Sequence, residues 1–205
     1  MRRTEYYDEL KHHARLTREK YNIATPRVKR SHLRTIYRDL GIKIDYWPYR
    51  LREIRGAYFH DDIGTTVMVV KSLPEDPMIF TLAHELKHHL FDQDQQAIYC
   101  SNTNVNQHIE IGAEIFAAEF IYPENEFIND LASKGITHGK CTPEAIVRLK
   151  HETETTLSHT GLAKRAMFLG LAPNGSLKDI RWIKLQEKIF GIPLYKTLWR
   201  KKKNR

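Results

Sequence analysis

The sequence has little cysteine and no long apolar run. Its 205 residues include only two cysteines, Cys100 and Cys141, which are too far apart to form a C-x-x-C pair. No segment reaches the roughly eighteen consecutive apolar residues that span a bilayer, and residues 1–7 contain no apolar signal-peptide core. These absences argue against a disulfide-stabilised secreted scaffold and a transmembrane protein. They predict a soluble, cytoplasmic protein.

Charge is unevenly distributed along the chain, whose formal net charge is +8. Residues 1–50 carry 13 Lys and Arg against 6 Asp and Glu, and residues 136–205 carry 15 against 5. Residues 72–135, in contrast, carry 2 against 11. An acidic middle suits a site that binds a divalent cation and attracts a basic peptide. The basic flanks could contact nucleic acid, or they could be solvated tails.

A His-Glu-x-x-His motif at residues 84–88 is the most informative feature that is present. It lies in an apolar run, Met78 to Phe91, that is typical of a single helix. Four residues make just over one helical turn, so His84 and His88 project from one face, where their imidazoles can share a tetrahedral Zn²⁺. Glu85 lies about 100° further round the helix. From there its carboxylate can take a proton from a metal-bound water and pass it to a leaving amine.

The phase of this helix argues against an accidental match, which the eleven histidines of the chain make easier. At about 100° per residue, five apolar residues form one stripe and the two histidines of the motif face the other way. The stripe residues are Ile79, Leu82, Ala83, Leu86 and Leu90. A helix with its back in the core and its histidines towards a cleft is what a zinc enzyme needs. We interpret the neighbouring His89 as a residue that packs beside the site.

A catalytic zinc usually takes three protein ligands and leaves the fourth position to water, so the site needs a third ligand. Our candidate is Glu110, which opens a second helical run that ends at Pro123. Glu114, one turn further on, is suited to accept the other ring N–H of a ligating imidazole and is a poorer candidate for a ligand. The alternative is that both glutamates belong to an ordinary solvated face.

Three other carboxylates are not expected at the site. Glu119 falls about 180° from Glu110 on the second helix and should face solvent. Asp92 and Asp94 follow the first helix too closely to turn back to its histidine face.

The two motifs together resemble the ImmA/IrrE family of zinc metallopeptidases, over roughly residues 54–170. The resemblance is carried by His84-Glu-Leu-Lys-His88 and by Glu110-x-x-Ala-x-x-Phe-Ala-Ala-Glu-x-x-x-Pro123. It implies that His84, His88 and Glu110 hold Zn²⁺ and that Glu85 is the catalytic base. Two positions depart from the usual pattern. Lys87 stands where a glycine is common, and should narrow or charge the cleft wall; Glu114 stands where an asparagine is common.

The sequence predicts an α+β fold of the zincin-like type, with a small antiparallel sheet packed on the zinc-motif helix. The metallopeptidase domain should cover residues 1–135, and a C-terminal helical subdomain with a basic tail residues 136–205. The turn signal at Asp61 to Gly64 predicts a hairpin, whose strand 65–70 is the candidate to receive an extended substrate by backbone pairing. The expected helices are 3–21, 26–40, one opening at Asp76-Pro77, 124–134, 143–152 and 157–169, and the expected strands are 42–47, 56–60 and 65–70.

The leading functional hypothesis is a zinc-dependent endopeptidase that cleaves a protein substrate. In the resembling family the usual substrates are helix-turn-helix repressors. Candidates for the group that stabilises the oxyanion are Tyr58, His60 and Tyr99. The alternatives are a non-catalytic regulator that keeps the zinc fold and binds DNA or a repressor, and the toxin partner of a two-gene module. The last helix pair, 143–152 and 157–169, looks like a helix-turn-helix in sequence, although most such pairs only pack.

Overall fold

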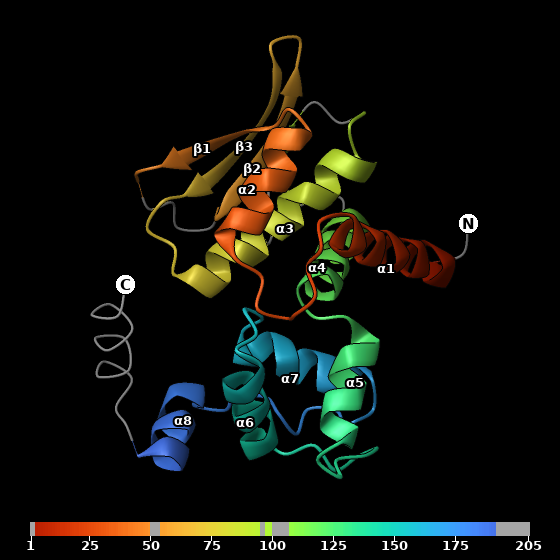
Figure 1. Cartoon of the computed structure of the whole chain (residues 1–205), viewed down its shortest axis with the longest axis vertical. Coiled ribbons are helices and arrows are strands. Elements are labelled where there is room, and N and C mark those ends of the chain that lie inside the picture. Colours follow the sequence, from red (N-terminus) through yellow and green to blue (C-terminus); the bar gives the residue numbers. More distant parts are fainter. Residues whose placement is uncertain (1–2, 50–53, 95–96, 100–106, 192–205) are drawn as a thin grey trace. The chain divides into compact units, whose positions relative to one another are not determined.

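The computed structural model describes residues 3–49, 54–94, 97–99 and 107–191. It divides the chain into two compact units, of which the first holds residues 1–124 and 155–157 and the second the remainder (Figure 1). The domain boundary expected after residue 135 thus falls within the second unit. The predicted α+β class is confirmed, because the first unit combines helices with a sheet and the described elements of the second are all helices.

The sheet of the first unit has four described strands in the order β1-β3-β2-β4. Their bounds are β1 Lys43–Trp47, β2 Gly56–Asp61, β3 Gly64–Val70 and β4 Ala97–Tyr99. The predicted hairpin is confirmed, since β2 and β3 pair antiparallel on either side of the Asp61 to Gly64 turn. The sheet is mixed rather than purely antiparallel, because β1 lies beside the returning strand of the hairpin and runs parallel to it.

The prediction that strand 65–70 receives a substrate is wrong. β3 pairs with β1 along one edge and with β2 along the other, so its backbone groups already have partners. Among the described strands, the sheet ends at β1 on one side and at β4 on the other. β4, which was not expected from the sequence, pairs antiparallel with β2.

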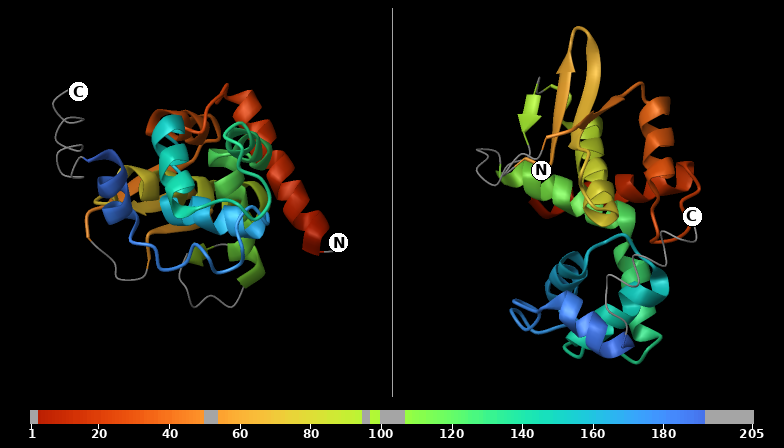
Figure 2. Two further views of the ribbon diagram at one scale, coloured as in Figure 1. Left: turned by 90° about the horizontal axis from the view of Figure 1, so that it is seen from below. Right: turned by 90° about the vertical axis from the view of Figure 1, so that its left-hand side faces the viewer.

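Helix α3 (Glu75–Phe91), which carries the zinc motif, lies between the sheet and helix α4 (Gln107–Ile121), and α1 (Arg3–Lys20) packs on α4 (Figure 2). Its predicted apolar stripe is buried at Ile79, Leu82, Ala83 and Leu86, whereas Leu90 is exposed. The helix buries polar residues as well, so its other face lies against α4 rather than along an open surface.

Two helices begin at other residues than expected. Helix α2 (Arg30–Asp39) starts after Pro26 rather than at it. Helix α3 starts one residue before Asp76, because Pro74 takes the N-cap position and accepts a hydrogen bond from the Met78 amide at 3.0 Å. Pro77 then lies in the first turn, where its missing N–H leaves no helical hydrogen bond unmade.

The second unit contains helices α5 (Glu124–Ala132, starting at the boundary), α6 (Pro143–Thr153), α7 (His159–Phe168) and α8 (Trp182–Phe190). The first three follow the predicted ranges closely; α8 was not predicted. Thr142 and Ser158 cap α6 and α7 by accepting hydrogen bonds from the amides of Ala145 and Gly161. Nowhere in the described part of the chain does a helix combine the length and apolar character needed to cross a membrane.

Candidate metal centre

The structure brings together His84, His88 and Glu110, the three ligands expected from the sequence. One potential ligand atom from each lies within 4.8 Å of the other two. His84 Nε2 is 3.3 Å from Glu110 Oε2, and His88 Nε2 is 3.7 Å from Glu110 Oε1. Two ligand atoms bound to one tetrahedral zinc, each about 2.0–2.1 Å from it, lie roughly 3.3 Å apart. The donor set and its spacing therefore fit a zinc ion.

Two helices supply these groups from opposite sides. The histidines project from α3 one turn apart, and Glu110 lies in the first turn of α4. Helix α4 buries three small residues, Gly112, Ala113 and Ala117, and Gly112 lies against α1, because a Cβ added there would fall 2.9 Å from Leu10 Cδ1. His88 is fully buried and His84 is 8% exposed, while the Glu110 side chain keeps 18% of its surface open. Solvent thus reaches the site chiefly on the side of Glu110 and His84.

His88 is oriented by Asp92, a carboxylate that was not expected at the site. His88 Nδ1 lies 2.7 Å from Asp92 Oδ2, which fixes the ring so that Nε2 faces Glu110. A ligating imidazole characteristically donates its other N–H to a carboxylate in this way. The prediction was wrong because Asp92, the C-cap of α3, follows His88 by four residues, the helical spacing that places two side chains on one face.

Lys87 does not line a cleft wall, as the sequence suggested, but is fully buried between α3 and α4. Its Nζ donates to Asp92 Oδ2 at 2.7 Å, the same oxygen that accepts from His88. Nζ also lies 3.4 Å from the Ile109 carbonyl, one residue before Glu110, and 5.7 Å from the centre of the Tyr6 ring. Lys87 thus connects the carboxylate that orients one candidate ligand to the backbone beside another.

The electrostatic setting differs between the two histidines. Burial lowers the pKa of His84, but the hydrogen bond to Glu110 and the charges of Glu85, Glu110 and Glu114 outweigh it and raise the pKa overall. Burial dominates at His88 and lowers its pKa, although the hydrogen bond to Asp92 opposes this. Burial alone would raise the pKa of Asp92, yet its hydrogen bonds to His88 and Lys87 and the Lys87 charge hold it below the usual range. Negative charge therefore gathers around His84, where it favours a cation.

Glu85 is fully buried, and its carboxylate lies against the first residue of β2. A Cβ added to Gly56 would fall 2.5 Å from Glu85 Oε1 and 2.5 Å from Thr81 Cγ2. Position 56 must therefore lack a side chain for the carboxylate to sit where it does. Sequence reasoning missed Gly56, because a glycine at the start of a strand carries no chemical signal of its own.

The remaining glutamates of α4 behave differently from one another. Glu114 is exposed, and its charge contributes to the raised pKa of His84. The expectation that Glu119 faces solvent is wrong: it is fully buried, and Arg15 donates to it at 2.7 Å. Its other oxygen accepts from the Glu124 amide at 3.0 Å. The phase argument failed here because α1 covers that side of α4.

His89 packs beside the site as expected, with Nδ1 3.4 Å from the Tyr58 hydroxyl and Nε2 3.4 Å from Gln93 Nε2. Tyr58, an oxyanion candidate, is buried on β2, and burial raises its pKa. A second candidate, His60, contacts Thr65 Oγ1 through Nδ1 at 2.8 Å. The side chain of Tyr99 lies outside the described residues, as does Cys100.

The relationship of the chain to known proteins agrees with this geometry. A comparison with curated proteins finds no significant match. The family model for the IrrE N-terminal-like domain, a peptidase family, matches residues 38–158, which is more than half of the chain and includes both motifs. The chain thus contains a metallopeptidase-like domain, and it belongs to the IrrE N-terminal-like peptidase family.

Proposed function

We propose that this protein is a zinc-dependent endopeptidase in which His84, His88 and Glu110 hold the metal and Glu85 is the general base. The observation that carries the proposal is the convergence of the three ligand atoms within 4.8 Å, on two different helices. The Asp92 carboxylate behind His88 supports it, because an imidazole that binds metal through one nitrogen characteristically donates its other N–H to a carboxylate.

A bound zinc ion supplies a Lewis acid that polarises the scissile carbonyl and makes water more acidic. Glu85 accepts the proton of the attacking water and delivers it to the nitrogen of the departing amine. Asp92 holds the His88 ring in the tautomer that keeps Nε2 free to bind metal. The buried Glu85 carboxylate lies against Gly56, and its charge acts on His84.

The substrate is a protein, and we propose that its scissile segment binds as an extended strand. β4 is the described edge of the sheet beside β2, and β2 itself packs on α3. A peptide could extend the sheet there through backbone hydrogen bonds. The resemblance to the ImmA/IrrE family favours a helix-turn-helix repressor as the natural substrate, which would make the protein a regulatory peptidase.

The test compares Glu85→Gln with the wild type, using a helix-turn-helix repressor as the proposed substrate and casein as a general substrate. We expect both proteins to contain about one zinc ion per chain by elemental analysis, and only the wild type to cleave. Glu110→Ala should lose both zinc and cleavage. Cleavage by Glu85→Gln at the wild-type rate would contradict the mechanism. Full zinc occupancy in Glu110→Ala would show that Glu110 is not a ligand, and Glu114 would become the candidate for the third ligand.

A second candidate function is a non-catalytic regulator that binds DNA or a repressor. It is favoured by the excess of 15 Lys and Arg over 5 Asp and Glu in residues 136–205, which include the pair α6 and α7. It predicts that Glu85→Gln keeps its biological effect and that DNA affinity falls steeply with salt. Toxicity on expression that a neighbouring gene relieves would instead identify the toxin partner of a two-gene module.

A further inference from the structure

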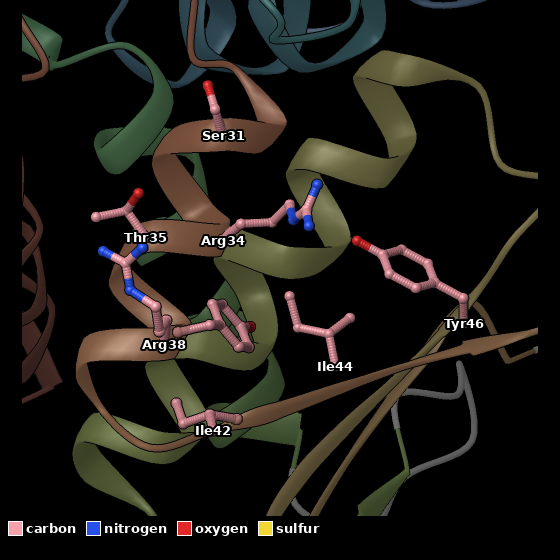
Figure 3. A pocket seen from close by; sticks show the side chains of 8 residues that line it. Ser31, Arg34, Thr35, Arg38, Ile42, Ile44 and Tyr46 are labelled. Carbon is pink, nitrogen blue, oxygen red and sulfur yellow. The ribbon is translucent and has the colours of Figure 1, made fainter.

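A second candidate site lies in the first unit, on a face that the peptidase chemistry does not use. It is a pocket of about 560 Å³ between α2 and β1, within the usual size range of small-molecule sites. Its lining residues are Ser31, Arg34, Thr35, Tyr37, Arg38, Ile42, Ile44 and Tyr46 (Figure 3). The lining thus contains two guanidinium groups and no carboxylate.

The periodicity of both elements explains why these residues meet. On α2, Ser31, Arg34, Thr35 and Arg38 follow helical spacing and form one polar face, while Leu33 and Ile36 point into the core. On β1, Ile44 and Tyr46 are alternate residues and therefore share one face of the strand. The pocket is accordingly basic and hydroxyl-bearing on the helix side and apolar and aromatic on the strand side.

Arg34 has the features of an anion contact. In Figure 3 its side chain extends from α2 towards the hydroxyl of Tyr46. Among the described residues no ion pair or hydrogen bond of Arg34 is found, whereas Arg38 bonds to Asp39 Oδ1 at 3.2 Å. In Figure 3 the Arg38 side chain extends the other way, towards Thr35, so Arg34 is the guanidinium group on the Tyr46 side of the pocket. Guanidinium groups bind phosphate oxygens in bidentate fashion.

We propose that this pocket binds a small organic phosphate of about the size of a nucleoside diphosphate. Arg34 contacts its phosphates, the Tyr46 hydroxyl offers a further hydrogen bond, and Ile42 and Ile44 provide an apolar surface for the rest of the ligand. The proposal does not depend on peptidase activity.

The pocket also contacts the helix of the metal centre. The buried Tyr37 lines it, and the Tyr37 hydroxyl donates to the Leu82 carbonyl of α3 at 2.7 Å, two residues before His84. A ligand in the pocket therefore lies against a side chain that is bonded directly to the helix carrying the candidate ligands.

The experiment measures binding of ADP, pyrophosphate and adenosine to the full chain by calorimetry at physiological salt, where non-specific attraction to a basic protein is screened. We expect saturable binding of ADP, and weakening of about tenfold or more in Arg34→Ala, the loss expected for a charged hydrogen bond. Arg38→Ala, which removes the guanidinium group on the Thr35 side of the pocket, should weaken binding less than Arg34→Ala. Arg30→Ala removes the same charge from the exposed start of α2, outside the pocket, and should change affinity less than about twofold.

Several results would overturn the proposal. Absence of saturable binding of both ADP and pyrophosphate at millimolar concentration is one, and an equal loss in Arg30→Ala is another, since it would indicate general attraction to positive charge. ADP binding that Arg34→Ala leaves unchanged would place the phosphate elsewhere, for example on a metal at His84. Arg34-dependent binding of a thymidine oligonucleotide without binding of ADP would make the face a nucleic-acid surface instead.

Discussion

The helix pair α3 and α4 of the first unit and the pair α6 and α7 of the second bury different kinds of side chain. In the second unit the core of the pair is apolar, with Ile146, Leu149, Leu162 and Ala166 buried and Arg165 as the buried charged residue. The first pair buries a polar network, in which Lys87 and His88 both bond to the Asp92 carboxylate. Burying a charge is unfavourable unless it is paired. The apolar core of α6 and α7 therefore mainly stabilises the fold, whereas the buried polar groups of α3 and α4 serve the candidate metal centre.

The largest effect should come from breaking the buried ion pair. We expect Lys87→Met to destabilise the first unit by on the order of 3 kcal/mol, because the Asp92 carboxylate stays buried without its cation. The same change at exposed Lys164 of α7 should shift the free energy of unfolding by less than about 0.5 kcal/mol. Denaturant unfolding measures both. Similar losses in the two variants would show that the charge contrast between the pairs has no energetic meaning.

The next effect concerns the metal rather than the fold. Asp92→Asn replaces the acceptor on His88 Nδ1 with a weaker one, and we expect zinc affinity to fall about 10–100-fold. Asp94→Asn is the matched control, since Asp94 is exposed two residues further on. Competition with a chromophoric chelator gives the affinities. An unchanged zinc affinity in Asp92→Asn would show that the contact between Asp92 and His88 does not contribute to metal binding.

A smaller effect on stability is expected from removing a helix cap in the pair α6 and α7. Ser158→Ala removes the acceptor for the Gly161 amide at the start of α7 and should cost about 1 kcal/mol. Thr160→Ala, an exposed change within the first turn of the same helix, should be near neutral. Thermal unfolding followed by circular dichroism compares the two. If they lose equal stability, the cap is not what sets the start of α7.

The smallest expected effect at neutral pH concerns the stability of the second unit, which should depend on pH. Burial and the charge of Lys150 lower the pKa of His159 to about 4, and Trp182 stacks on its ring. The unfolded chain takes up this proton near pH 6.5, so stability should fall as the pH drops from about 6.5 to about 4. His159→Gln should flatten this slope, and His151→Gln, a change at an exposed histidine of the same unit, should not. An unchanged slope in His159→Gln would assign the acid sensitivity to other groups.

Predictions that rest on residues close together in the sequence agree with the structure. Helices α6 and α7 start within about two residues of their predicted positions, because Thr142 and Ser158 are local signals next to an apolar periodicity. The spacing of His84, Glu85 and His88 is local in the same sense. Glu110 was predicted because it opens the second helical run and belongs to the second motif of the family resemblance.

What the sequence could not provide depends on contacts between distant segments. The burial of Glu119 requires Arg15 of α1, and the position of Lys87 requires α4 and Tyr6. The central place of β3 follows from the pairing of β1, which is more than twenty residues upstream. The role of Asp92, in contrast, was within reach of the sequence, because its spacing of four residues from His88 is helical.

Gly56 has a consequence for how such proteins are searched for functional positions. In a screen of all single substitutions for loss of cleavage, we expect substitutions of Gly56 to be as damaging as those in the zinc motif. Any added side chain at position 56 would collide with Glu85 and Thr81. A search by chemical type passes over the position, since glycine offers no donor, acceptor or charge. What position 56 contributes is the absence of a side chain, which leaves room for the Glu85 carboxylate and the Thr81 methyl group.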